Sequence, residues 1–99
     1  MTTLIVGLGN PGEKYRFTRH NSGFLALEEL SARWNIPLNQ KGFRSVYGKG
    51  LWEGRQVVLS QPQTYMNASG GAVRDIAAFF KIIPQNIIVI HDDLDFPLG

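Results

Sequence analysis

The chain contains no cysteine, and this absence excludes disulfides, thiolate metal ligands and a thiol nucleophile. It also lacks any apolar run near the roughly 20 residues with which a helix crosses a membrane. The N-terminus has no basic segment followed by a long apolar one, so we expect no secretory signal. The absence of cysteine fits a reducing compartment. We therefore expect a cytoplasmic protein with no membrane partner.

Charge and histidine are scarce as well. The 99 residues carry 10 Lys and Arg against 8 Asp and Glu, for a net charge of +2, and only two histidines. This mild excess favours an anionic partner only slightly and differs from the polybasic tails of strong nucleic-acid binders. The length allows one domain at most. A hydrophobic content of 43% is ordinary for a globular protein.

The order of strand and helix patterns predicts the fold class. Strands are expected over residues 4–8, 44–49, 55–60 and 86–90, and helices over residues 22–34 and 70–82. The two middle strands are expected to form a hairpin around Trp52-Glu53-Gly54. This order predicts an α/β domain with a mixed, mostly parallel sheet flanked by helices, in a three-layer α/β/α arrangement.

Each predicted helix carries one apolar stripe, with the spacing of three or four residues that places side chains on one face. We expect these residues to face the sheet: Phe24, Leu27, Leu30 and Trp34 in the first helix, and Val73, Ile76, Ala77 and Phe80 in the second.

The last predicted strand, residues 86–90, is almost continuously apolar, a pattern typical of strands buried on both faces. No helix pattern follows to cover it before Gly99. We therefore expect residues 1–99 to form a domain that is incomplete at its C-terminus. Its unpaired sheet edge would favour association.

Four polar residues follow the carboxyl ends of three predicted strands. Asn10 and His20 follow the first strand, Asn67 the third and Asp92 the last. Open α/β sheets assemble their sites at this edge. Each residue has an ordinary structural explanation by itself: an exposed loop histidine, a helix cap or turn, or an acid that accepts hydrogen bonds from loop amides. Their coincidence at one edge favours a candidate active site.

A histidine near a carboxylate predicts general-base chemistry. The carboxylate of Asp92 would hold the proton on one ring nitrogen of His20 and raise the basicity of the other. That nitrogen would remove a proton from water, which then attacks an acyl carbonyl. The amides of Asn10 and Asn67 would donate hydrogen bonds to the substrate or to the water. Ser69 is a weaker candidate nucleophile, because its surroundings do not match G-x-S-x-G.

Two other motifs suggest ligands of different kinds. Residues 7–12 match G-x-G-x-x-G literally, but the next predicted helix begins near Ser22, too far on for its N-terminus to meet a dinucleotide pyrophosphate. A tight turn explains these glycines. The acidic group at residues 91–95 would suit Mg²⁺ or Mn²⁺. No fixed ligand spacing supports a metal site there, and we assign none.

The first loop alternates cations with aromatic rings. Lys14, Arg16 and Arg19 would bind phosphates, and Tyr15 and Phe17 would stack on a base, as the end of a single-stranded nucleic acid requires. A solvated loop with aromatic anchors explains the same residues. We keep Tyr15 as a candidate substrate-binding residue.

Three separated blocks carry a resemblance to a known family. They are Gly-Leu-Gly-Asn-Pro-Gly-(x)₂-Tyr-(x)₂-Thr-Arg-His-Asn-(x)-Gly-Phe over residues 7–24, Gln-Pro-Gln-Thr-Tyr-Met-Asn-Ala-Ser-Gly over residues 61–70, and His-Asp-Asp-Leu-Asp-Phe-Pro-Leu-Gly over residues 91–99. In order and spacing they resemble the bacterial-type peptidyl-tRNA hydrolases.

The resemblance implies a carboxylic ester hydrolase of translation. Such an enzyme cleaves the ester between a nascent peptide and the 3′ ribose of tRNA, and it recycles the tRNA with no metal or organic cofactor. His20 would be the base that activates water, and Asp92 would be its carboxylate partner. The substrate-facing residues that the resemblance implies are Asn10, Tyr65, Met66 and Asn67.

The resemblance covers about the first half of the family's domain. The family continues with further strands, a substrate-binding Gly-His-Asn-Gly segment, basic residues that grip tRNA phosphates and a C-terminal helix. The implied partner is the acceptor end of peptidyl-tRNA. The family is usually monomeric, and the unpaired edge leaves self-association open. The alternatives are a non-catalytic RNA- or protein-binding module of the same fold, or a fragment with neither property.

Overall fold

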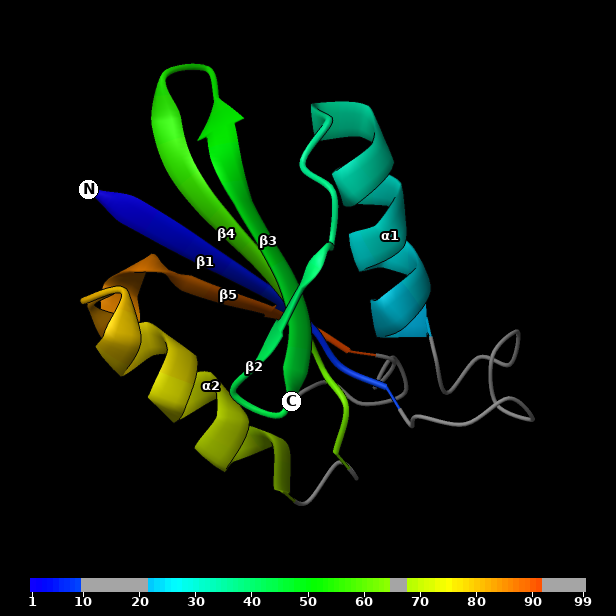
Figure 1. Ribbon diagram of the computed structural model, residues 1–99, viewed down its shortest axis with the longest axis vertical. Coiled ribbons are helices and arrows are strands. Elements are labelled where there is room, and N and C mark those ends of the chain that lie inside the picture. Colours follow the sequence, from blue (N-terminus) through cyan, green and yellow to red (C-terminus); the bar gives the residue numbers. More distant parts are fainter. Residues whose placement is uncertain (10–21, 65–67, 92–99) are drawn as a thin grey trace.

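The computed structural model describes residues 1–9, 22–64 and 68–91, which form a sheet and the helices packed on it (Figure 1). The elements are β1 (Thr2–Gly7), α1 (Ser22–Trp34), β2 (Gln40–Gly42), β3 (Ser45–Trp52), β4 (Arg55–Pro62), α2 (Ser69–Phe79), the short 3-10 helix η4 (Pro84–Asn86) and β5 (Ile87–Ile90). Both predicted helices and all four predicted strands are confirmed, and α1 has its predicted bounds. Within these residues no helix combines the length and the apolar character that crossing a membrane requires.

One strand was not predicted, and one helix ends earlier than predicted. The strand β2 was not expected, because its exposed Gln40 and Lys41 show no apolar alternation; it forms by pairing antiparallel with β3. The helix α2 ends at Phe79, before the predicted end at residue 82. Its end is set by Lys81, whose φ of 58° is left-handed and cannot continue a helix.

The sheet has the strand order β2-β3-β4-β1-β5. β1 runs parallel to both of its neighbours, β4 and β5, whereas β3 pairs antiparallel with β2 and with β4. The prediction of a mixed sheet is confirmed. The prediction of a mostly parallel one is only partly right, because two of these four pairings are antiparallel. The parallel pairs form through long crossovers, whereas a tight turn joins β3 to β4.

A two-residue turn joins β3 to β4 and confirms the predicted hairpin. Trp52 lies opposite Arg55, and between them Glu53 and Gly54 have φ angles of 53° and 80°. Two consecutive positive φ angles are typical of a type I′ turn, whose twist matches that of the strands. The Trp52 ring stacks on Trp34 at the end of α1, with ring centroids 4.4 Å apart. The stacking ties the hairpin to that helix.

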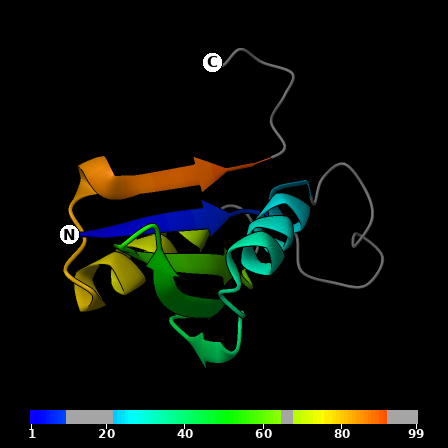
Figure 2. The same cartoon turned by 90° about the horizontal axis from the view of Figure 1, so that it is seen from above.

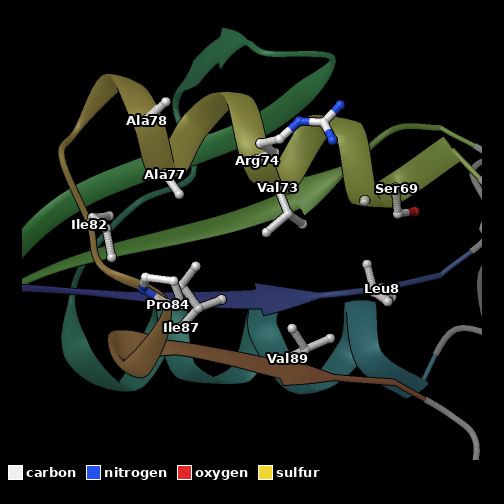
Figure 3. Close-up of a pocket in the computed structure, with 11 residues that line it drawn as sticks. Leu8, Ser69, Val73, Arg74, Ala77, Ala78, Ile82, Pro84, Ile87 and Val89 are labelled. Atoms are coloured by element: carbon white, nitrogen blue, oxygen red, sulfur yellow. The ribbon is translucent and has the colours of Figure 1, made fainter.

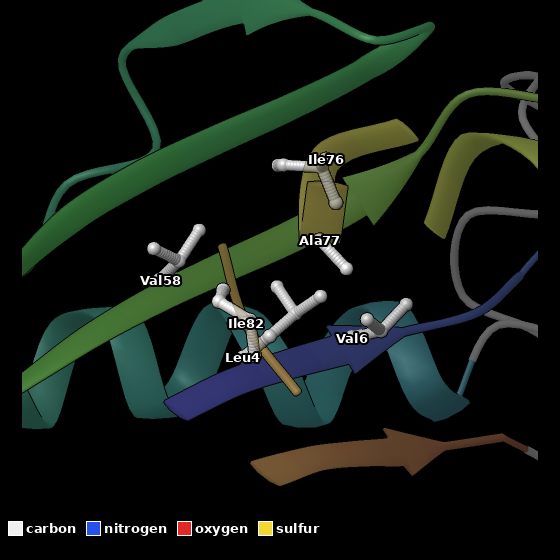
Figure 4. Close-up of a cluster of buried hydrophobic side chains, with 6 residues drawn as sticks. All are labelled: Leu4, Val6, Val58, Ile76, Ala77 and Ile82. Atoms are coloured by element: carbon white, nitrogen blue, oxygen red, sulfur yellow. The ribbon is translucent and has the colours of Figure 1, made fainter. Parts of the chain in front are cut away.

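Side chains alternate between the two faces of the sheet and build a core on each face, with the period of two that strands impose. The cluster on the α1 face consists of Ile5, Leu27, Ile36, Val57 and Leu59. The cluster on the α2 face consists of Leu4, Val6, Val58, Ile76, Ala77 and Ile82 (Figure 4). The predicted helix stripes are thus confirmed, and one helix covers each face in the expected three-layer arrangement (Figure 1).

The strand β5 is more exposed than its apolar sequence predicts. Figure 2 shows it at the outer edge of the sheet, beside β1. Ile88 is 51% exposed and Val89 is 43% exposed. The prediction of a strand buried on both faces is therefore wrong for the described residues. A continuous apolar run indicates that a strand can be buried, but burial depends on which neighbours cover it.

Candidate active site

The residues predicted to do chemistry lie outside the described parts of the chain. This applies to His20, Asp92, Asn10, Tyr15, Tyr65, Met66 and Asn67. The structure does describe the positions that flank them: Gly9 and Ser22, Thr64 and Ala68, and His91. Those flanking positions show where each of the three segments begins or ends.

The three segments leave the ends of adjacent parallel strands. β4, β1 and β5 lie side by side in that order, with Val6 opposite Ser60 and Gly7 opposite Ile90. The pairing continues beyond β1, where the Leu8 amide donates a hydrogen bond to the Ile90 carbonyl oxygen at 2.8 Å. The chain therefore leaves all three strands at their carboxyl ends, which lie together at one end of the sheet (Figure 1). We call this end the strand edge, as distinct from the lateral edge that β5 forms. This is the edge at which open α/β sheets place ligands and catalytic groups.

The first turn of α1 packs against the same edge. A Cβ on Gly23 would lie 2.3 Å from the Leu8 carbonyl oxygen and 2.5 Å from the Ile90 carbonyl oxygen. From the strand side, a Cβ on Gly7 would lie 2.4 Å from the Gly23 carbonyl oxygen and 2.7 Å from the Cβ of Leu27. Real Cβ atoms essentially never approach other atoms within 3.0 Å. Glycine is therefore what allows the helix backbone to touch the strands directly.

A buried glutamine ties β4 to the same end of α1. Gln61 is 6% exposed, and its Nε2 donates to the Phe24 carbonyl oxygen at 3.1 Å and to Glu28 Oε2 at 3.2 Å. Buried amides need such partners, because an unpaired one costs free energy. Sequence analysis missed this residue. The signal that could have found it is a polar side chain that shares the α1 face of β4 with Val57 and Leu59.

The connection from β4 to α2 is held by hydrogen bonds near both of its ends. Thr64 Oγ1 and Ser69 Oγ lie 3.3 Å apart, and the Gln63 amide donates to the Arg44 carbonyl oxygen at 2.8 Å. The Arg44 guanidinium also donates to Asp75 of α2 at 2.7 Å. The start of α2 is thus fixed beside the end of β4.

The described residues contain no group of three or more His, Cys, Asp and Glu side chains that could hold a metal ion. Of the acidic group at residues 91–95, only His91 is described, and it is exposed. The metal site considered from the sequence therefore lies almost wholly outside the described residues.

Comparison with known proteins identifies the family. The family model described as peptidyl-tRNA hydrolase matches residues 4–99. The chain belongs to the peptidyl-tRNA hydrolase family. The curated peptidyl-tRNA hydrolase of Brevibacillus brevis is 52% identical over 96 residues, which are 97% of this chain and 51% of that protein. That of Bacillus cereus is 51% identical over 96 residues, or 52% of its length.

Solved peptidyl-tRNA hydrolases share the fold. A structure of the Acinetobacter baumannii protein and a structure of a peptidyl-tRNA hydrolase in complex with N-propanol each match with a TM-score of 0.89 and 45% identity. Each match covers 96% of this chain and 49% of the other. The resemblance carried by the three sequence blocks is thus confirmed, and so is the α/β class. The chain spans about half the length of the peptidyl-tRNA hydrolases it matches.

A groove of about 560 Å³ runs between α2 and β5 on the α2 face of this peptidyl-tRNA hydrolase fold (Figure 3). Leu8 and Ser69 place one of its ends at the strand edge described above. Most of the lining is apolar, and the charged side chain in it is that of Arg74. Because it holds no acid or histidine among the described residues, the groove does not supply a general base. The candidate chemistry belongs to the loops at the edge.

Proposed function

We propose that this chain carries the catalytic loops of a peptidyl-tRNA hydrolase, which hydrolyses the ester between a peptide and the 3′ ribose of tRNA. The observation that supports this most directly is the common edge of β4, β1 and β5, because the segments with His20, Asn67 and Asp92 all adjoin it. The reaction is proposed because the chain belongs to the peptidyl-tRNA hydrolase family. Residues 1–99 would then be part of one such domain, acting in the cytoplasm on the acceptor end of peptidyl-tRNA.

In the proposed mechanism His20 is the general base. Its neutral imidazole accepts a proton from water while the water oxygen attacks the ester carbonyl. Asp92 holds the other ring nitrogen in its protonated form and stabilises the imidazolium that results. Collapse of the tetrahedral intermediate breaks the bond to the ribose oxygen, which takes the proton back from His20. The products are the free peptide acid and tRNA.

The substrate is held by the remaining candidates. The amides of Asn10 and Asn67 donate hydrogen bonds to the oxygens of the ester and the peptide, where negative charge develops in the transition state. Tyr65 and Met66 contact the substrate beside Asn67, and Tyr15 stacks on a base of the acceptor end. The reaction proposed for these residues uses no metal or organic cofactor.

The test is release of tRNA from N-acetyl-aminoacyl-tRNA by the chain, with EDTA present. We expect turnover that falls by 10² to 10⁴-fold in His20→Ala, the usual contribution of a general base. Gln56→Ala is the matched control, because Gln56 is exposed at the amino end of β4, away from the candidate edge. Circular dichroism establishes that each variant is folded.

The other outcomes have definite meanings. Equal rates for His20→Ala and the starting protein would remove His20 from the mechanism. Binding of tRNA without turnover, by a folded sample, would favour the non-catalytic RNA-binding module over the enzyme. Loss of turnover in EDTA would require a metal and contradict the mechanism above.

A further inference from the structure

Within the described residues, the α-helices α1 and α2 both begin with Ser-Gly, but the two glycines have opposite surroundings. Gly23 is the second residue of α1 and Gly70 is the second residue of α2. A Cβ on Gly70 would meet nothing within 4 Å, whereas a Cβ on Gly23 would lie 2.3 Å from the Leu8 carbonyl oxygen. The sequence therefore contains its own control for a glycine at this helix position.

The contact at Gly23 is made with backbone atoms of two strands. The atoms nearest a Cβ at this position are the carbonyl oxygens of Leu8 and Ile90, followed by the Leu8 nitrogen at 2.9 Å. The Leu8 amide and the Ile90 carbonyl are themselves joined by a hydrogen bond of 2.8 Å. Gly23 thus packs on the link between the end of β1 and the end of β5. Backbone atoms in a sheet cannot rotate away, so a side chain at this position displaces the helix.

The contact is equally close when it is viewed from Gly7 of β1. A Cβ on Gly7 would lie 2.4 Å from the Gly23 carbonyl oxygen. Gly23 is buried, and so is Gly7. The first turn of α1 therefore meets β1 and β5 through direct backbone contacts, in a core where even small volume changes are felt.

We propose that Gly23 is a positioning residue, which sets the placement of His20 relative to Asp92 and so the rate of the hydrolysis proposed above, on which this inference rests. His20 lies three residues before Gly23, and Asp92 lies two residues after Ile90. Segments of three and two residues span at most about 11 Å and 7 Å. The Gly23–Ile90 contact thus joins described residues that lie close in the sequence to both segments. We therefore expect a displacement of α1 at this contact to change the placement of His20 relative to Asp92.

The first experiment compares Gly23→Ala with Gly70→Ala in the assay with N-acetyl-aminoacyl-tRNA. We expect Gly23→Ala to lower kcat by about 10²-fold with little change in KM, since a misplacement of about 1 Å at a reacting group has this effect and Gly23 is not placed against substrate. Gly70→Ala should keep kcat and raise Tm slightly, because Ala favours a helix over Gly. Ile76→Ala, in the core of the opposite face, should lower Tm and keep the kcat of the folded protein.

The second experiment does not depend on turnover. The pKa of the His20 imidazole is measured by NMR titration with and without Asp92→Asn, and the second histidine signal is assigned with His91→Gln. We expect Asp92→Asn to lower the pKa of His20 in the starting protein and in Gly70→Ala, and to have no effect in Gly23→Ala. If the coupling is present in the starting protein and in Gly70→Ala, is lost in Gly23→Ala, and no variant shows turnover, then the proposed activity of this chain fails while the role of Gly23 in placing His20 stands.

Two results would overturn the inference. One is a folded Gly23→Ala protein with unchanged kcat and unchanged coupling between His20 and Asp92. The other concerns folding: Gly7→Ala attacks the same contact from the strand side, and we expect it to act like Gly23→Ala. If both variants fail to fold while Gly70→Ala folds normally, the contact serves folding itself, and the positioning role is withdrawn.

Discussion

At the scale of single residues, the candidate chemistry depends on one imidazole and one carboxylate that follow the ends of different strands. An unperturbed histidine has a pKa of about 6.5, so its neutral form becomes available near neutral pH. A nearby carboxylate favours the charged imidazolium and therefore raises that pKa. Both effects can be seen in how the hydrolysis rate varies with pH.

We expect kcat/KM to rise about tenfold per pH unit below the pKa of His20, because only the neutral imidazole accepts a proton, and to level off above it. Asp92→Asn should lower the plateau and move the rise to lower pH, since the carboxylate no longer favours the imidazolium. Initial rates between pH 5 and 8.5 measure both changes. A rate that does not vary between pH 5 and 8 would exclude His20 as the base.

At the scale of elements, the start of α1 is held against three strands by contacts of two kinds. Glycine contacts join it to β1 and β5, and the Gln61 carboxamide joins it to β4. Both atoms that accept hydrogen bonds from Gln61, the Phe24 carbonyl oxygen and Glu28 Oε2, lack a proton to donate. The tie therefore requires a donor at position 61.

Replacements of Gln61 should follow this rule. Gln61→Met has a similar size but no donor, and we expect it to lower the free energy of unfolding by about 1–2 kcal/mol. Gln61→Lys should lose less, because its ammonium group donates to both acceptors. The control is Gln56→Met, at an exposed glutamine of the same strand, with an expected change within about 0.5 kcal/mol. Urea unfolding measures all three, and equal stability of Gln61→Met and Gln56→Met would contradict the role given to the carboxamide.

At the scale of the whole molecule, two cores share the same strands. β1 supplies Ile5 to the core on the α1 face, and Leu4 and Val6 to the core on the α2 face. One face cannot lose its order without disturbing the strands that build the other. We infer that the described elements unfold as one unit.

A substitution in either core should therefore lower the midpoint of one common unfolding transition. Leu27→Ala on the α1 face and Ile76→Ala on the α2 face remove fully buried side chains, and each should cost about 2–5 kcal/mol. Tryptophan fluorescence reports on the stacked Trp34 and Trp52 near α1, and far-UV circular dichroism reports on all elements. We expect the two signals to change together in every variant. Separate midpoints would show that the faces unfold independently.

Local sequence patterns were enough to predict both α-helices and four of the five strands of the described residues, as well as the family. Residues that are close in the sequence decide the bounds of α1, the hairpin and the apolar stripes, because these features depend on local spacing and turn chemistry. The three blocks that resemble peptidyl-tRNA hydrolases were also recognisable without coordinates, and the family model confirms them. The predicted catalytic and substrate-binding residues lie outside the described residues, so they stay predictions.

Which of these elements meet became apparent from the fold alone. The exposure of Ile88 and Val89 follows from the place of β5 at the sheet edge, which no local pattern contains. Gln61 and Phe24 are 37 residues apart in the chain, yet they are joined by a hydrogen bond. Gly23 and Gly70 are both the second residue of a helix that begins with Ser-Gly, and of the two only Gly23 packs against the ends of the strands. Such contacts join segments that are distant in the sequence, and the approach of these segments depends on how the whole sheet is assembled.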